Sequence, residues 1–191
     1  MVDVARMLLW SIDETTGFDS AWVRIDADRM TAEGRACGLS SNPFWVSYTL
    51  ETSGAYVTSR VVAESRWEGG SAVLDLRRDD AGWTVNGGRR PDLDGALDCD
   101  LAYCPLTNTM PILRHGLHLR PGEHDLLMAF IEVPSLRVTP NRQRYTHLRA
   151  NEDGGGLVRY SSGSFQSDLT IDRDGFVVDY PQLGRRVDAT L

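Results

Sequence analysis

Phe44-Trp45-Val46-Ser47-Tyr48-Thr49-Leu50-Glu51 is the stretch that decides the fold class. Its even-numbered residues are apolar, and its odd-numbered residues are polar apart from Trp45. Because successive side chains of an extended chain point to opposite faces, a period of two predicts a strand with one buried side. Trp45 would then lie on the other side of that strand.

The chain continues to produce strand patterns on both sides of this stretch. Residues 56–67, which contain the strand-forming residue types Val, Thr and Tyr, follow Ser53-Gly54 and predict the second arm of a hairpin. Turn sequences such as Asn86-Gly87, Pro121-Gly122 and Asp174-Gly175 separate later runs. Further strands are predicted at residues 7–12, 21–25, 31–38, 72–77, 82–85, 97–103, 113–119, 125–133, 136–138, 143–149, 157–160, 165–171 and 176–178.

This number of strands predicts a mainly antiparallel β protein. No window of helical length sustains a 3.6-residue apolar period, although short helical turns fit residues 13–20 and 105–110. Sheets of more than about ten strands curl or close because each strand adds twist. The sequence contains no linker or repeat, so we expect one domain over residues 1–191, rolled around an interior.

Net charge and cysteine content limit which partners and which cellular compartment we expect for this protein. A formal net charge of −7 disfavours nucleic acid as a partner, and every one of the basic residues is Arg. Three cysteines cannot all pair within one chain, which favours a reducing compartment. No secretory signal or membrane-spanning run is recognisable, and we expect a cytoplasmic protein.

Three blocks between residues 82 and 112 resemble a known protein family. Gly82-Trp83-Thr84-Val85-Asn86-Gly87, Leu97-Asp98-Cys99-Asp100-Leu101 and the run from Cys104 to Ile112 together resemble the family described as "putative glycolipid-binding". Further similarities lie at Glu33-Gly34, Asn42-Pro43, Val46, Tyr48, residues 134–138, Gln143, Tyr145 and residues 174–181. The resemblance spans nearly the whole chain.

The resemblance implies a single-domain antiparallel spiral β-roll, similar in shape to bacterial lipid and lipoprotein carriers. It implies a glycolipid or another amphipathic small molecule as ligand, with its apolar part held in the concavity of the rolled sheet. The family supplies no established catalytic or ligand residues, so none is carried over to this chain. Its pattern does not require thiols at Cys99 and Cys104.

Asp98 and Asp100 support an alternative, a hydrolase acting on a sugar-containing substrate. Two carboxylates spaced by two residues on a strand project from one face, at a separation that suits general acid and base catalysis. The favoured interpretation is that they form the solvent face of the strand or pair with arginines at residues 77, 78, 89 or 90. The sequence has no recognisable signature of a catalytic nucleophile. Its glycine-rich stretches are interpreted as turns and not as nucleotide-binding loops.

We expect no metal and no cofactor. His115, His118 and His124 lie close in sequence, but an odd spacing on a strand would direct His115 and His118 to opposite faces. With Pro121-Gly122 as a hairpin turn, these histidines are expected at the surface.

Our expected ligand site gathers amphipathic and polar side chains around one cavity mouth, with Arg114 as the cation for an anionic head group. The aromatic residues could also be ordinary core, and the loop of residues 105–111 could cap the roll instead of binding sugar. A homodimer formed through an open sheet edge is a further alternative. The proposed site residues are Trp67, Trp83, Tyr103, Asn108, Arg114, Gln143 and Tyr145.

Overall fold

Fifteen strands form one continuous sheet in the computed structural model, which describes residues 4–40 and 42–187. The order runs from the edge strand β8 back to β1, passes to β15, and continues in reverse to the other edge at β9. The first half comprises β1 (Val4–Ile12), β2 (Gly17–Asp26), β3 (Arg29–Gly38), β4 (Phe44–Thr52), β5 (Thr58–Trp67), β6 (Gly70–Asp79), β7 (Gly82–Val85) and β8 (Gly88–Arg89).

The second half of the chain supplies the remaining strands and the one α-helix of the described residues. Its strands are β9 (Asp98–Leu101), β10 (Glu123–Ile131), β11 (Val138–Ala150), β12 (Gly156–Ser162), β13 (Phe165–Ile171), β14 (Val177–Tyr180) and β15 (Gly184–Arg186). The helices are α1 (Thr109–His115) and the 3-10 turns η1 (Asp13–Thr15), η2 (Gly54–Tyr56), η3 (Pro91–Leu93) and η4 (Pro105–Asn108). Among these helices, none has the length and apolar character needed to cross a membrane.

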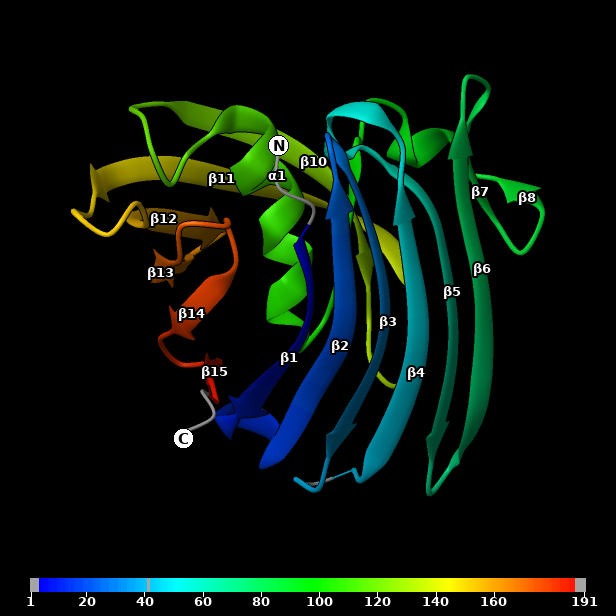
Figure 1. Cartoon of the computed structure of the whole chain (residues 1–191). Coiled ribbons are helices and arrows are strands. Elements are labelled where there is room, and N and C mark those ends of the chain that lie inside the picture. The colour runs from blue at the N-terminus through cyan, green and yellow to red at the C-terminus, as the bar shows by residue number, and fades with distance from the viewer. Residues whose placement is uncertain (1–3, 41, 188–191) are drawn as a thin grey trace.

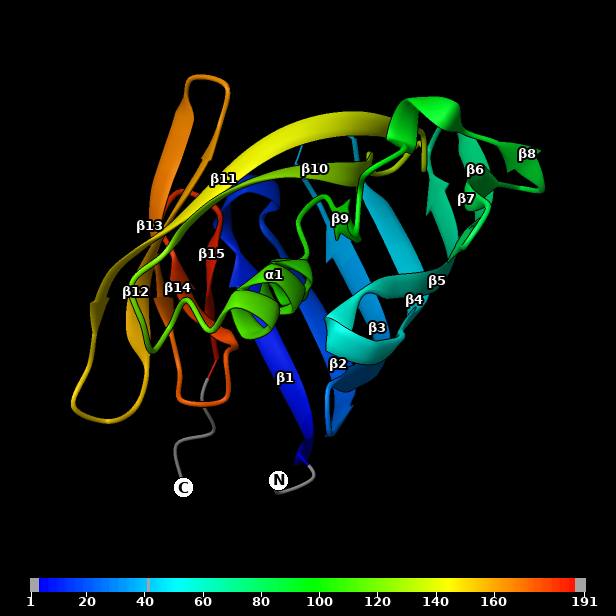
Figure 2. The same cartoon turned by 90° about the horizontal axis from the view of Figure 1, so that it is seen from above.

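The sheet winds on itself so that its second half covers the first (Figures 1 and 2). All neighbouring strands are antiparallel except β9 and β10, which are parallel and are connected through η4 and α1. The edge strand β9 returns to β5, where the Thr58 N–H donates to the Leu97 carbonyl over 3.0 Å. The predicted mainly antiparallel, spirally wound sheet is therefore confirmed.

The space between the two layers is filled by side chains. On β2 and β3 every second residue is buried, which is the alternation expected of strands with one inward face. Trp10, Trp83 and Phe176 are among the largest fully buried side chains. The concave side of the roll is thus a packed core over most of its extent.

The predicted strand at residues 113–119 is wrong. This segment contains the end of α1 and a turn, and Gly116 (φ +64°) ends the helix by donating to the Leu113 carbonyl. Met110, Pro111 and Ile112 are consecutive and all buried, and a helix of seven residues is too short to show an apolar period. Pro105 begins η4 and Gly116 follows α1, positions at which helices commonly begin and end.

Two predicted turns have opposite outcomes. Asn86 (φ +49°) and Gly87 (φ +82°) connect β7 to β8 and confirm the predicted hairpin. Pro121-Gly122 is not a hairpin turn, because the segment before it is the end of a helix and not a strand. His115 and His118 therefore do not lie on a strand, and His118 is buried instead of lying at the surface.

Gly34 offers a test of the packing between β3 and β4. The Tyr48 ring lies over Gly34, and a Cβ atom there would overlap the ring carbon Cζ. Gly34→Ala is expected to lower the free energy of unfolding by about 1–3 kcal/mol in urea denaturation, because the ring is held in a close-packed core. The control is Gly88→Ala, where the new Cβ would lie 3.4 Å from the Val85 carbonyl oxygen, an ordinary contact. Equal stabilities of the two variants would contradict this description of the core.

Candidate functional site

A pocket of about 330 Å³ opens at the end of the roll where β1 turns into β2. We call it the end pocket. Segments far apart in the sequence converge on it: η1, the β9–η4 region, β10 to β14 and the β14–β15 turn. Its lining residues are Glu14, Asp100, Leu101, Ala102, Tyr103, Cys104, Asn108, Phe130, Asn141, Tyr160, Ser162, Phe165, Tyr180 and Leu183.

Aromatic rings form one side of the end pocket. Tyr160 packs against Phe165 at a centroid distance of 6.0 Å and against Tyr180 at 5.9 Å, with interplanar angles of 62° and 60°. Tyr145 packs edge-on against Tyr160 at 5.4 Å from the side of β11, because these two residues are cross-strand partners. The register of β11, β12 and β13 therefore assembles the aromatic cluster.

A chain of hydrogen bonds forms the polar side. Asp100 accepts from Thr107 Oγ1 at 3.0 Å and from Gln143 Nε2 at 2.6 Å. The Tyr145 hydroxyl lies 2.8 Å from Asn108 Oδ1 and 3.2 Å from Gln143 Oε1, and its single proton donates to one of them at a time. Because these groups hold one another, the polar surface is ordered before any ligand arrives.

Burial shifts the titration of the groups at this site. It raises the pKa of Asp100 above the usual value for aspartate, while the donors Gln143 and Thr107 oppose the rise. It also raises the pKa values of Tyr160 and Tyr180 above that of a free tyrosine. These two hydroxyls therefore stay protonated and can both donate and accept hydrogen bonds.

A second polar cluster lies behind Cys104, inside the roll. The Tyr48 hydroxyl donates to Asp19 Oδ1 at 3.0 Å, and Cys104 Sγ lies 3.3 Å from the same hydroxyl oxygen. Asp19 is fully buried, and its Oδ2 has no hydrogen-bond partner among the described residues. Burial raises the pKa of Asp19 to about 7.

Four of the seven site residues proposed from the sequence lie at or directly behind the end pocket. Tyr103 and Asn108 line it, and Gln143 and Tyr145 belong to the hydrogen-bond chain that supports it. Trp67 lies opposite Phe44 on β4, and Phe44 stacks on Tyr103 at a centroid distance of 5.9 Å. Trp67 is therefore close to the same end of the roll without lining the pocket.

The other two proposed residues are engaged inside the protein. Trp83 is buried and its Nε1 donates to the Ala96 carbonyl at 2.9 Å. Both terminal nitrogens of Arg114 contact the Asp98 carboxylate, and the two side chains are only 9% and 1% exposed. The structure thus does not bring Trp83 and Arg114 to the end pocket, and the Arg114 guanidinium already holds an anion.

The two carboxylates of β9 therefore have different partners. Asp98 is buried beside Arg114; burial raises its pKa, while the guanidinium favours the ionised form and limits the rise. Asp100, two residues further on, lines the end pocket and accepts from neutral groups. Neither the solvent-exposed strand face nor pairing with arginines 77, 78, 89 and 90, as considered from sequence, describes this arrangement.

Several pocket residues were absent from the site proposed from sequence. Tyr180 and Phe165 come from the last third of the chain, and Glu14 from the β1–β2 turn. The available signal was alternation: Tyr160 and Ser162 share a face of β12, as Asn141, Gln143 and Tyr145 share a face of β11. Alternation does not reveal which strands meet at one end of a spiral.

The histidines do not form a metal site in the part of the chain that the structure describes. His115 and His124 stack with ring centroids 3.7 Å apart. No group of three or more histidine, cysteine, aspartate or glutamate side chains within residues 4–40 and 42–187 is arranged to hold a metal ion.

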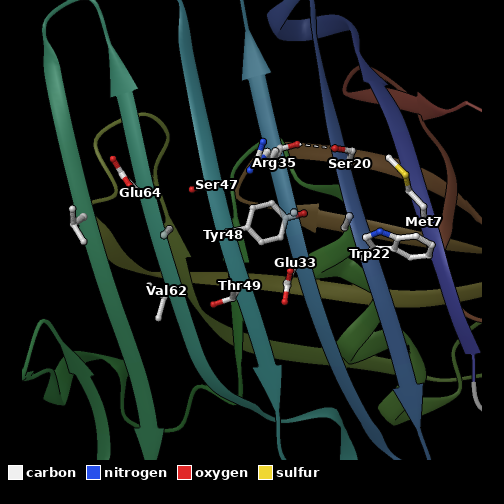
Figure 3. A pocket seen from close by; sticks show the side chains of 14 residues that line it. Met7, Ser20, Trp22, Glu33, Arg35, Ser47, Tyr48, Thr49, Val62 and Glu64 are labelled. Carbon is white, nitrogen blue, oxygen red and sulfur yellow. Dashed lines mark hydrogen bonds between the residues drawn. The ribbon is translucent and has the colours of Figure 1, made fainter.

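A broader trough of about 540 Å³ crosses the outer face of the first half of the sheet (Figure 3). Its labelled side chains, including Met7, Trp22, Glu33 and Arg35, stand on neighbouring strands with polar and apolar groups intermixed. Trp22 is 63% exposed, so the trough is shallow at its apolar residues. The end pocket is the better candidate because rings and supported polar groups converge there.

Asp19 generates a prediction about stability and pH. Burial raises the pKa of its carboxyl from the ordinary value of 3.8 to about 7 in the folded protein, so the unfolded chain binds fewer protons between these two pH values. Stability should therefore fall as pH rises from about 4 to about 7, by about 4 kcal/mol at most from this group. Asp19→Asn should remove this part of the pH dependence in urea denaturation.

The matched control is Asp26→Asn, at an exposed position of the same strand. In this variant, the change in the free energy of unfolding between about pH 4.5 and about pH 8 should equal that of the parent protein. An Asp19→Asn variant with the parent's pH dependence would show that the Asp19 carboxyl does not titrate as described.

Comparison with known proteins places these features in a family. The model of the family described as "putative glycolipid-binding" matches residues 7–186. A crystal structure of a DUF1089 family protein from Pseudomonas aeruginosa is 31% identical, with a TM-score of 0.73 over 88% of this chain and 92% of that one. A β-barrel-like DUF1849 protein from Brucella abortus shares the fold at 10% identity, with a TM-score of 0.56 over 96% of this chain and 94% of that one. The search of curated proteins gave no match. The chain belongs to the family described as "putative glycolipid-binding".

Proposed function

We propose that this protein binds the sugar head group of a glycolipid in the end pocket and is not an enzyme. The observation that carries the proposal is the meeting of Tyr160, Phe165 and Tyr180 with the hydrogen-bonded groups around Asp100 and Asn108. Ring faces match the apolar C–H surface of a pyranose, and the amide and carboxylate oxygens suit its hydroxyls. The family description supports a ligand of this class.

The size of the pocket sets which part of the ligand enters. Small-molecule sites measure about 300–1,000 Å³, and the end pocket, at about 330 Å³, is at the small end of that range. The interior of the roll is occupied by Trp10, Trp83, Phe176 and their neighbours. These facts support a head-group site with the lipid chain outside it, in place of an apolar chain enclosed by the concave face.

The hydrolase alternative has less support. A glycosidase needs two carboxyl groups that flank the bond to be broken. Only Asp100 of the β9 pair is among the lining residues of the end pocket, and Asp98 is held by Arg114. The arrangement favours recognition over acid and base chemistry at this pair.

Partners and location follow as proposals from composition. The net charge of −7 supports the absence of nucleic acid among the partners. The three free thiols, Cys37, Cys99 and Cys104, support a reducing, cytoplasmic compartment. The outer edge of β8, which has no further strand beside it among the described residues, leaves a homodimer as a proposal that light scattering can test.

Phe165 provides the test of the site. Phe165→Ala should weaken the binding of octyl glucoside, measured by titration calorimetry below its micelle concentration, by about five- to tenfold, because a ring face is lost from the pocket. Phe18→Ala is the matched control, since Phe18 is likewise an exposed strand residue (52% against 42% for Phe165) but does not line the pocket. Loss of affinity in both variants alike, or no binding by the parent protein, would contradict the proposed function.

A further inference from the structure

The charge of the end pocket has one sign. Its carboxyl groups are those of Glu14 and Asp100, and no arginine or histidine is among its described lining residues. Arg114, the cation expected there from sequence, is bound to Asp98. An anionic head group would therefore meet two carboxylates and no compensating cation.

Asp98 and Asp100 supply an internal comparison. Both come from the four-residue strand β9, and both have pKa values raised by burial. Asp98 has a guanidinium as counter-charge, whereas the hydrogen-bond donors to Asp100 are the amide of Gln143 and the hydroxyl of Thr107. A partly buried carboxylate without a cationic partner is costly, and a ligand cation beside it would remove much of that cost.

The rings of the end pocket also favour a cation. Tyr160, Phe165 and Tyr180 meet at steep angles, the last two at 44° with centroids 6.5 Å apart, and so form walls of different orientation. The faces of aromatic rings are electron-rich and attract ammonium groups within about 6 Å. Glu14 lines the same pocket, and its charge adds to burial in raising the pKa values of Tyr103 and Tyr180.

We propose that the head group recognised in the end pocket is an amino sugar, whose ammonium group lies between the aromatic rings and the Asp100 carboxylate. This inference rests on the proposed function and specifies its ligand. Glu14 contributes a second negative charge at the rim, where it is exposed and attracts the cation over a longer range.

Three octyl glycosides with the same chain test the proposal: the glucoside, the glucosaminide and the glucuronide. Their affinities are measured by calorimetry at about pH 6.5, where the sugar amine is mostly protonated. The glucosaminide should bind about five- to tenfold more tightly than the glucoside, and the glucuronide should bind most weakly. Asp100→Asn should abolish the preference for the glucosaminide, since the asparagine oxygen can still accept from Gln143 and its NH2 group can donate to the Thr107 hydroxyl, but the side chain carries no charge.

Glu14→Gln, at an exposed position, should reduce the preference about twofold without affecting folding. Glu33→Gln, which removes the same charge from the outer face of the sheet, should leave it unchanged. Equal affinities for glucoside and glucosaminide in the parent protein would overturn the amino-sugar proposal while the sugar-binding function stands. Binding of none of the three would overturn both.

Discussion

Thr58, at the start of β5, makes the contact on which the shape of the roll depends. Its N–H donates to the Leu97 carbonyl at 3.0 Å, and its Oγ1 accepts from the Cys99 N–H at 3.1 Å, so the edge of one half of the sheet is fixed to the other half. The side chain is fully buried, where unpaired backbone groups of β9 would be costly. This contact joins the β9 edge of the sheet to the interior strand β5, and the second half remains over the first.

The position of β9 in turn determines the chemistry of the site. Fixing β9 against β5 and beside β10 leaves Asp98 under α1, where Arg114 reaches it, and brings Asp100 to the end pocket. The hydrogen-bond chain through Gln143, Tyr145 and Asn108 then ties β11 to η4 behind the pocket. One short strand therefore separates a carboxylate with an internal cation from a carboxylate that is open to a ligand.

The sequence predicts the strands far better than it predicts the site. Long alternating stretches such as β4 were predicted within a residue, because alternation with one buried face is a local signal. α1 and β15 were missed, since a helix of seven residues is too short to show a period and Gly184–Arg186 is too short and polar to show one. For the site, the sequence correctly grouped four residues, namely Tyr103, Asn108, Gln143 and Tyr145. It did not predict the pairing of Arg114 with Asp98 or the position of Tyr180 in the pocket, because both depend on how distant strands pack in the roll.

A crystal structure of the protein soaked with an octyl glycoside tests the central claim most directly, because it locates the ligand without relying on a variant. We expect the pyranose ring to pack against Tyr160 and Phe165, within hydrogen-bond distance of Asp100 or Asn108. The octyl chain should be directed out of the end pocket. A ligand between the two layers of the roll, displacing Trp10 or Trp83, or one seated on the outer face beside Trp22, would contradict it.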